Sequence, residues 1–597
     1  MLNVSKLDAG PVLAEKMPRA FSLSEGTAVE ASDGPAGYAV ERRADGGVAI
    51  RHGDASDLMT ALGDIVSGTA AEKHVHPFEF RGAMLDASRG GVPETEWLES
   101  FILRLALLGY NYFCLYTEDT FEVSGEPLIG YARGRLSKTE IRRLDAFASS
   151  IGTTIFPCVQ TLGHMEQILR YAKYAPLRDT KRVLHTKKRK TIEFVGKLLE
   201  NASEPYSTDI IHVGMDEPWG LGRGEAFEEG VPVNPLEIYA EHAAAVAVAA
   251  ADLGLRPIMW GDVILGRSGG REMSDDEKAA LPANLEMDYW NYFSEEESDY
   301  LRDIEAFRKM GREPIFSPGL HTWNRFFPDA ALFEKTAIPG IRAARSAGLK
   351  KILATIWGDD GAECLFGNAA PQLALLAGEI RSDTSGDAWK KRLEAIFGIS
   401  RKEAEALAAV ESPAASNSDG KNLPAKTLFY DDPLIGAAAR FLRNPAETAA
   451  AFAETAENLR KLKPSRRDSE FAALFAEIVA AKTALAADAA DAYAKKDRGG
   501  LAEASEKSAE TAGTVRRAFE IYEDLWLAER KPFGLEVVEG RFATLASRLE
   551  TLAERIDAYL AGTLPSIAEL EEPPPPGLAP EDLKFHSQLA TRQHSIW

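Results

Sequence analysis

Residues 78–119 hold two short apolar runs on either side of a longer segment with helical spacing: FEFRGAMLD (78–86), ETEWLESFILRLALLG (94–109) and YFCLYTED (112–119). Each short run is apolar for most of its length and ends in acidic residues. Strands that are buried on both faces have this continuous apolar character, as in a parallel sheet covered by helices. The stretch therefore predicts a strand, a helix and a parallel strand.

The same alternation continues along the chain until eight strands have appeared. The other strand candidates are TTIFPCVQT (153–161), IIHVGMDE (210–217), PIMWGDVI (257–264), LEMDYWNY (285–292), EPIFSPGL (313–320) and KILATIWGDD (351–360). Eight such units predict an α/β fold, a (β/α)8 TIM barrel over residues 77–412, whose active site lies at the carboxyl ends of the strands.

Two regions flank the predicted barrel. Residues 1–76 predict a small α/β domain, with a hairpin at GYAVERRADGGVAIRHG (37–53) and an amphipathic helix at ASDLMTALGDIVSG (55–68). Residues 413–597 predict a helical region of about four helices, followed by the proline-rich ELEEPPPPGLAPEDL (569–583) and a short tail. We expect this region either to cover a face of the barrel or to form a homodimer.

Composition limits the possible partners. The 597 residues carry 69 basic and 91 acidic side chains, a net charge of -22, which argues against nucleic acid as a partner because phosphates require a basic surface. No stretch approaches the roughly 20 apolar residues that span a bilayer, so no membrane association is expected. The three cysteines form no disulfide framework, and Cys114 and Cys158 are predicted to be buried free thiols. The start of the chain has no secretion signal, so we expect a cytoplasmic protein.

Polar and aromatic residues gather at the predicted strand ends, and one of these ends is unusual. HVGMDEPWG (212–220) places Asp216 beside Glu217, although neighbours on a strand face opposite ways. The other strand ends supply Asp86, Ser88, Arg89, Glu118, Asp119, Gln160, His164, Trp260, Asp262, Tyr289, Trp290, Asn291, Tyr292, His321, Trp323, Trp357, Asp359 and Asp360. Carboxylates, one arginine and many aromatic rings around a barrel mouth favour a sugar site.

Adjacent acids do not fit the common glycosidase arrangement. That arrangement has two carboxyl groups facing each other across the scissile bond, about 5–10 Å apart. Asp216 and Glu217 would instead approach from one side. If a 2-acetamido group of the substrate is the nucleophile, one acid can protonate the leaving oxygen while the other holds the acetamide.

The predicted barrel resembles the family 20 glycoside hydrolases, the β-N-acetylhexosaminidases. The similar motifs are RGAMLDASRGGVP (81–93), LYTEDTFEV (115–123), QTLGHMEQ (160–167), HVGMDE (212–217) and IWGDDGAE (356–363), in the family's order. The resemblance covers about residues 77–380, and the N-terminal unit is similar to the domain that precedes the barrel in this family.

The resemblance implies an exo-acting retaining enzyme that removes terminal β-linked N-acetylglucosamine or N-acetylgalactosamine from a small glycan or glycoconjugate through an oxazolinium intermediate. It implies that Glu217 is the general acid/base, that Asp216 orients the acetamide, and that His164 hydrogen-bonds Glu217 with Glu118 behind it. With these roles we expect Asp216 to be ionised and Glu217 to be largely protonated, because burial and a like-charged neighbour raise a carboxyl pKa. The implied sugar contacts are made by Arg89, Trp260, Trp323, Trp357 and Asp359.

The sequence departs from the commoner family pattern at several positions. Met215 stands where a second glycine is usual, Gln160 replaces an aspartate, and Glu118 stands where aspartate is usual. The tyrosine that donates to the acetamide is Tyr289 in our interpretation, with Tyr292 as the alternative.

Three functions remain open: the glycosidase, a non-catalytic glycan-binding protein, and a metal-dependent deacetylase on the same barrel. The acid at Glu217 favours the enzyme over the binder. HVH (74–76) has a spacing typical of metal-dependent barrel hydrolases, but it precedes the first strand instead of following it. The sequence also has no glycine-rich phosphate loop. We expect neither a metal nor a cofactor.

Overall fold

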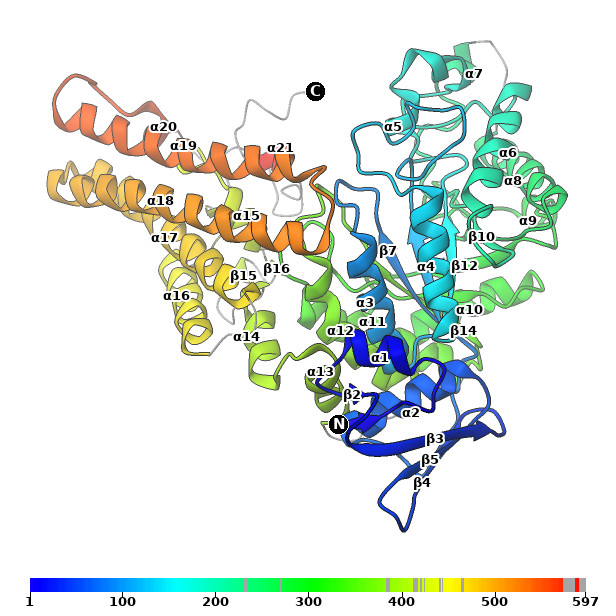
Figure 1. The fold of residues 1–597 in the computed structure, drawn as a ribbon. Coiled ribbons are helices and arrows are strands. Elements are labelled where there is room, and N and C mark those ends of the chain that lie inside the picture. Colours follow the sequence, from blue (N-terminus) through cyan, green and yellow to red (C-terminus); the bar gives the residue numbers. More distant parts are fainter. Residues whose placement is uncertain are drawn as a thin grey trace.

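The structure of the chain is a computed structural model. It describes residues 1–228, 234–268, 270–382, 387–411, 417–418, 421–422, 425–436, 438–439, 442, 444–462, 467–572 and 586–589. Most of the proline-rich stretch and most of the tail lie outside the described residues. A barrel occupies the middle of the chain, with a small sheet domain at one end and a row of long helices beside it (Figure 1).

The predicted TIM barrel is confirmed. Eight parallel strands close in the order β10-β11-β12-β13-β14-β7-β8-β9. Their bounds are β7 (Phe80–Asp86), β8 (Tyr112–Tyr116), β9 (Thr154–Cys158), β10 (Ile210–His212), β11 (Arg256–Trp260), β12 (Glu286–Trp290), β13 (Ile315–Ser317) and β14 (Lys351–Ile356).

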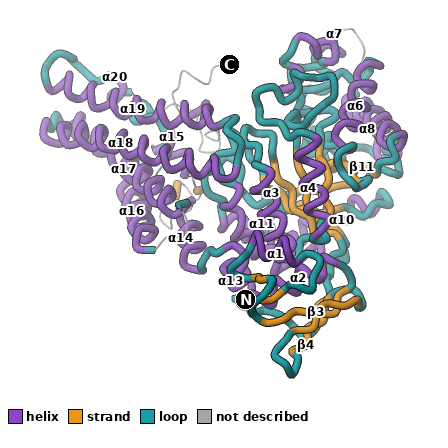
Figure 2. The backbone as a smooth tube through the Cα atoms, in the orientation of Figure 1, coloured by secondary structure: helices purple, strands orange, loops and turns teal. Residues whose placement is uncertain are grey.

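A helix follows each strand, and together these helices surround the barrel (Figure 2). They are α3 (Thr95–Leu108), α4 (Lys138–Ser150), α6 (Arg189–Ser203), α8 (Pro235–Asp252), α9 (Asp275–Ala279), α10 (Glu297–Lys309), α11 (Ala330–Ser346) and α12 (Ala370–Ile380). One further helix, α13 (Ala388–Phe397), follows α12. Shorter helices lie in the loops: α5 (Glu166–Leu169), η1 (Ala172–Leu177), α7 (Glu225–Glu228) and η2 (Phe366–Ala369).

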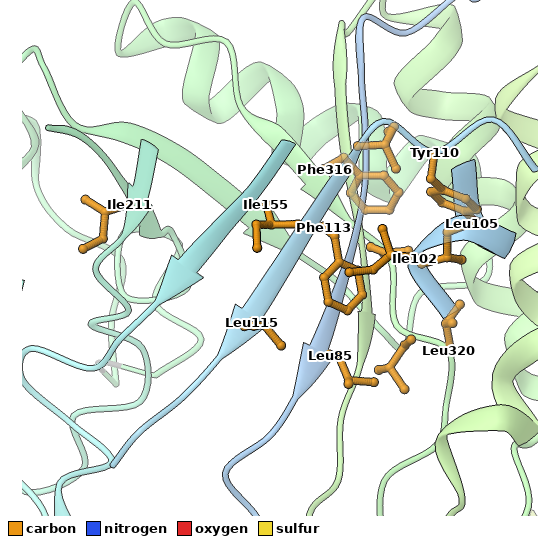
Figure 3. Packing of buried hydrophobic residues seen from close by; sticks show 14 of the residues in the cluster. Leu85, Ile102, Leu105, Tyr110, Phe113, Leu115, Ile155, Ile211, Phe316 and Leu320 are labelled. Atoms are coloured by element: carbon orange, nitrogen blue, oxygen red, sulfur yellow. The ribbon is translucent and has the colours of Figure 1, made fainter. Parts of the chain in front are cut away.

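Alternate residues of each strand serve two separate cores. Phe113 and Leu115 of β8 point outward and pack with residues of α3 such as Ile102 (Figure 3). The alternate residues of the same strand, Cys114 and Tyr116, belong to the cluster inside the barrel. This alternation follows from the two-residue period of a strand, and it decides which strand-end side chains can reach the pocket.

The N-terminal part is a mixed sheet of order β2-β1-β3-β5-β4-β6 with two helices. The elements are β1 (Leu2–Asn3), α1 (Gly10–Lys16), β2 (Phe21–Ser22), β3 (Thr27–Asp33), β4 (Tyr38–Arg42), β5 (Val48–His52), α2 (Ala55–Ser67) and β6 (Lys73–His74). The predicted hairpin is the antiparallel pair β4–β5, in which Tyr38 faces His52. Asp54 caps α2 by accepting the backbone N–H of Asp57.

The C-terminal part is helical, as predicted. Its elements are α14 (Arg401–Glu411), β15 (Asn417–Ser418), β16 (Lys421–Asn422), α15 (Ala425–Tyr430), α16 (Pro445–Lys461), α17 (Asp468–Lys495), α18 (Arg498–Glu529), α19 (Leu535–Leu560), α20 (Ala568–Glu571) and α21 (His586–Leu589). The long helices pack in sequence, α16 on α17, α17 on α18 and α18 on α19. They share a core with Phe326 and Ala362 of the barrel loops, so this region is packed against the barrel. The domain limits at residues 76 and 412 stay predictions.

Two further predictions concern burial and membranes. Cys114 and Cys158 are buried free thiols, as predicted. Within the described residues, every helix is too short or too polar to cross a bilayer.

Candidate active site

A pocket of about 150 Å³ opens at the carboxyl ends of the barrel strands. It contains seven of the ten side chains to which the sequence gave a role, together with Tyr292, the alternative acetamide donor, and two others. Its lining residues are Arg89, His164, Asp216, Glu217, Trp290, Tyr292, Phe293, Trp323, Trp357 and Asp359.

The backbone after β10 explains how two adjacent acids reach one pocket. The strand ends at His212, and Gly214, Met215 and Glu217 then have φ angles of 66°, 74° and 43°. A left-handed conformation is unusual for a residue with a side chain, and such residues are typical of functional sites. The chain therefore curls instead of alternating, and both Asp216 and Glu217 line the pocket.

Gln160 fixes the carboxylate of Asp216. Its Nε2 donates to Asp216 Oδ1 at 2.7 Å and to the hydroxyl of Tyr116 at 2.9 Å, and its Oε1 accepts the backbone N–H of Met215 at 3.2 Å. A Cβ atom at Gly214 would lie 2.2 Å from this Oε1, so only glycine leaves space for the amide. Gln160 is fully buried and was noted in the sequence only as a departure from a family pattern.

His164 lies between the acids and Glu118. Its Nε2 is 3.3 Å from Asp216 Oδ2 and 3.8 Å from Glu217 Oε2, and its Nδ1 is 3.7 Å from Glu118 Oε1. The expected hydrogen bond to Glu217 is therefore wrong, because the ring is nearer to Asp216. His164 itself has a left-handed backbone, with φ of 53°.

The charges of these groups are coupled. Burial raises the pKa of Asp216, but His164 and the Gln160 amide outweigh it and lower the pKa to about 2. Burial lowers the pKa of His164, but the Asp216 carboxylate outweighs it and raises the pKa to about 9. Burial and the negative charge of Asp216 both raise the pKa of Glu217. The site thus pairs an ionised Asp216 with a Glu217 shifted toward its protonated form.

Asp262, which follows β11, supports Glu217 from below. Its Oδ2 accepts the backbone N–H of Glu217 at 3.2 Å, and the side chain is buried. Burial and the charge of Asp216 raise the pKa of Asp262 to about 7. The sequence placed Asp262 at a strand end but gave it no role.

Arg89 pairs with three other carboxylates of the site. Its Nη1 lies 2.9 Å from Asp86 Oδ2 and 3.5 Å from Asp359 Oδ1, and its Nε lies 3.1 Å from Glu118 Oε1. Glu118 is buried behind Arg89 and does not line the pocket. Burial raises the pKa of Glu118 to about 7, although Arg89 and His164 lower it.

Aromatic rings close the remaining wall. The indole N–H of Trp357 donates to the Tyr292 hydroxyl at 2.9 Å, and the ring of Tyr292 lies 5.2 Å from that of Trp323. Trp290 stacks on Tyr292 at 5.1 Å. The sequence gave no role to Trp290. It also missed Phe293, which is 68% exposed at the rim of the pocket. The position of Phe293 directly after the strand-end Tyr292 could have identified it.

Two predicted contacts fall outside the pocket. Tyr289 points away from the barrel interior, packs on Phe307 and donates to Asp303 at 2.8 Å, so its proposed role at the acetamide is wrong. Strand alternation is the reason, because its neighbour Asp288 faces inward. Trp260 is fully buried among the side chains inside the barrel, 6.1 Å from the ring of Trp357, and lies beneath the pocket instead of lining it.

The HVH motif lies in the N-terminal part. His74 belongs to β6, and Nε2 of His76 is 3.7 Å from Asp57 Oδ1. Among the residues that the structure describes, no three His, Cys, Asp or Glu side chains are grouped as a metal site would need.

Comparisons with known proteins point to one family. The family model described as the Glycoside Hydrolase 20C C-terminal domain matches residues 403–588. Human Hexosaminidase D is 27% identical over 227 residues, which are 36% of this chain and 45% of the human protein. Bovine Hexosaminidase D is 26% identical over 215 residues, which are 34% of this chain and 60% of the bovine protein. The chain is similar to proteins of glycoside hydrolase family 20.

Solved structures of this family share the fold. The exo β-N-acetylglucosaminidase of Vibrio harveyi, in complex with N-acetylglucosamine, has a TM-score of 0.51 at 15% identity over 68% of this chain and 73% of that chain. The N-acetyl-β-hexosaminidase of Streptomyces plicatus has a TM-score of 0.50 at 17% identity over 66% and 89% of the two chains. The chain spans 45% and 60% of the two curated relatives, less than two thirds of either.

Met215 has an unusual backbone for its residue type. Its left-handed φ of 74° is one that glycine adopts without strain. The methionine is fully buried and its carbonyl accepts the Tyr239 hydroxyl at 3.1 Å. The surrounding core thus supports a conformation that the residue type disfavours.

Proposed function

We propose that this chain is an exo-acting retaining β-N-acetylhexosaminidase that uses the 2-acetamido group of its substrate as the nucleophile. The observation that carries the proposal is the pair at the end of β10: Asp216 and Glu217 line one pocket, with the pKa of Asp216 lowered and that of Glu217 raised. The names of the relatives, Hexosaminidase D and N-acetyl-β-hexosaminidase, support the same class of substrate.

In the first step, protonated Glu217 gives its proton to the glycosidic oxygen as the bond to the anomeric carbon breaks. The acetamide carbonyl oxygen attacks the anomeric carbon and forms a cyclic oxazolinium ion, while the leaving group departs as an alcohol. Ionised Asp216 accepts the acetamide N–H and offsets the positive charge that develops on the ring. Gln160 holds Asp216 in the orientation that this requires.

In the second step, ionised Glu217 accepts a proton from water, which attacks the anomeric carbon from the side that the leaving group occupied. The oxazolinium ring opens, the acetamide is restored, and the sugar retains its β configuration. Glu217 regains the proton that it lost, so the site returns to its starting state.

Tyr292 is the proposed acetamide donor in place of Tyr289. Its hydroxyl oxygen accepts from Trp357 Nε1 and from Thr355 Oγ1 at 3.2 Å, so its own proton is free to point into the pocket. Burial raises the pKa of Tyr292, which keeps the phenol neutral and able to donate. Trp323 and Trp357 would enclose the sugar ring, and Arg89 and Asp359 would bind its hydroxyls.

The test compares nitrophenyl β-N-acetylglucosaminide and β-N-acetylgalactosaminide with the plain β-glucoside, with and without a thiazoline mimic of the intermediate. We expect cleavage of acetamido sugars only, blocked by the thiazoline. Cleavage of the plain glucoside at a similar rate would overturn the mechanism and indicate a protein nucleophile. Thiazoline binding without any cleavage would instead favour the non-catalytic glycan-binding protein. Release of acetate without nitrophenol, abolished by a chelator, would favour the metal-dependent deacetylase.

A further inference from the structure

The loop that carries Asp359 has a strained backbone. It follows β14, and we call residues 357–367 the Asp359 loop. Asp360, Gly361 and Ala362 have φ angles of 62°, 101° and 52°. Non-glycine residues in this region cost on the order of 1–3 kcal/mol each, so the conformation persists only where surrounding contacts hold it.

The contacts that hold the Asp359 loop come from the helical region. Nη1 of Arg541, on α19, donates to the carbonyl of Asp360 at 2.6 Å and to Glu363 Oε1 at 2.7 Å, and its Nη2 donates to Asp360 Oδ1 at 2.9 Å. Lys426 of α15 binds Asp360 Oδ2 at 2.7 Å. The loop residue Glu363 is buried and is further fixed by the hydroxyl of Tyr430 at 2.8 Å.

The end of α18 adds a second set of bonds to the same loop. Arg530, which is buried, donates to the carbonyl of Cys364 at 2.5 Å and to that of Ala362. The carboxylate of Glu529 accepts the backbone N–H of Phe366 at 2.7 Å. The backbone of the Asp359 loop is thus hydrogen-bonded to the helical region at Ala362, Cys364 and Phe366.

The same part of the helical region also holds the loop that carries Arg89, residues 87–94 after β7. The backbone of Glu94 donates to the carbonyl of Glu529 at 3.0 Å, and that of Lys531 donates to Val92 at 2.8 Å. A Cβ atom at Gly534 would lie 1.8 Å from the carbonyl oxygen of Gly90, so the two backbones are in direct contact. The turn between α18 and α19 thus touches both loops, at the end of these helices that faces the barrel (Figure 1).

The two loops meet again in the pocket, where Arg89 Nη1 lies 3.5 Å from Asp359 Oδ1. We propose that residues 529–541, the corner between α18 and α19, position these two sugar-binding side chains, with Arg541 as the main positioning residue. The identity of the substrate in this inference rests on the proposed function, whereas the contacts between the corner and the two loops do not depend on it. It gives the helical region a role in the affinity of the pocket, whereas Asp216 and Glu217, in the loop after β10, lie outside the corner's contacts.

The test compares Arg541→Met with Arg548→Met. Arg548 lies two turns further along α19 and binds the buried Asp432 at 2.8 Å, so it controls for the loss of a buried ion pair on the same helix. We expect R541M to raise the KM for the aryl N-acetylhexosaminide about tenfold with kcat changed less than threefold, and R548M to leave both within twofold. Because Arg541 directly contacts the loop that carries Asp359, we expect the KM of R541M/D359A to lie well below the product of the two single effects.

Hydrogen–deuterium exchange supplies a readout that does not depend on activity. We expect faster exchange in residues 357–367 and 87–94 of R541M than in R548M, at equal thermal stability. Arg541→Lys serves where R541M does not fold; it keeps the charge but loses the forked geometry, and we expect a KM increase of about threefold.

Equal KM values and equal exchange in R541M and R548M would overturn the positioning role. Additive losses in the double variant would also contradict it. A wild-type protein that cleaves no N-acetylhexosaminide would remove the proposed function, and the exchange comparison alone would then decide whether the corner holds the two loops.

Discussion

Nε2 of Gln160 lies 2.7 Å from Oδ1 of Asp216, and the same side chain accepts the backbone N–H of Met215. One buried amide therefore fixes both the carboxylate and the turn that carries it. Gln160 lies just after β9 and Asp216 lies in the loop after β10, so the orientation of Asp216 depends on the pairing of these two strands. The predictions below begin from this contact.

Gln160→Leu removes the neutral donor from an ionised carboxylate. A hydrogen bond to a charged group contributes about 1.5–3 kcal/mol, so we expect kcat/KM to fall about 10- to 100-fold. Gln372→Leu is the matched control, because Gln372 is buried on α12 outside the pocket. Steady-state kinetics of both variants on the aryl N-acetylglucosaminide measure the effect. Equal activity of the two would show that Gln160 does not orient Asp216.

Glu217→Gln removes the proton donor but leaves the shape of the pocket. General acid catalysis contributes about 10²–10⁴-fold, so we expect a loss of that size on substrates with alkyl or sugar leaving groups. On a dinitrophenyl glycoside, which leaves without protonation, we expect a loss of less than about tenfold in the first step. The dependence of kcat/KM on leaving-group pKa measures this difference. Equal losses on both classes would argue against the acid role.

His164→Asn tests the electrostatic coupling through the pH profile. His164 lowers the pKa of both Asp216 and Glu217. Without its charge, the Asp216 pKa should rise from about 2 toward the ordinary value of about 4, so the acid limb of kcat/KM moves to higher pH. The Glu217 pKa should also rise, so the basic limb, where the acid loses its proton, moves to higher pH as well. Unchanged limbs would contradict the assignment.

Tyr292→Phe and Tyr289→Phe separate the two tyrosines. Each change removes one hydroxyl, but only Tyr292 lines the pocket. We expect Y292F to lower kcat/KM about 10²-fold, the effect of losing one donor to a developing charge. We expect Y289F to stay within twofold of the wild type, because its hydroxyl binds Asp303 away from the site. A larger loss in Y289F would restore the original assignment.

Asp64→Asn tests how the N-terminal part is attached. Asp64 of α2 is fully buried, and it binds Arg392 at 2.8 Å and Arg381 at 3.1 Å. The variant leaves two buried cations poorly paired, so we expect a loss of about 3–5 kcal/mol in the free energy of unfolding, measured in urea. A loss below about 1 kcal/mol would contradict the burial of this pair.

The stabilisation by the ion pairs of Asp64 depends on pH in a defined direction. Burial raises the pKa of Asp64, but the two arginines outweigh it and the folded-state pKa is lowered. The stabilisation is therefore complete above the unfolded value of about 3.9 and is lost as the pH falls through the folded-state pKa. The difference in the free energy of unfolding between the wild type and D64N should therefore become smaller at acid pH. A constant difference between neutral and acid pH would argue against this linkage.

The sequence by itself determined the barrel and most of the pocket. Apolar runs with a strand period, separated by helical ones, predict parallel strands, and the carboxyl ends of such strands converge on one face. Arg89, His164, Asp216, Glu217, Trp323, Trp357 and Asp359 were all found in this way, because each lies within a few residues of a strand end.

Only the tertiary structure decided which way a strand-end side chain points and what holds it. One residue of register separates Tyr289, which faces α10, from the pocket, and the chain must turn back after β12 before Tyr292 faces inward. The pairing of Gln160 with Asp216, and of Arg541 with the Asp359 loop, joins residues 56 and about 180 positions apart. Local patterns do not encode such contacts, because they depend on strand pairing and on the packing of α19 against the barrel.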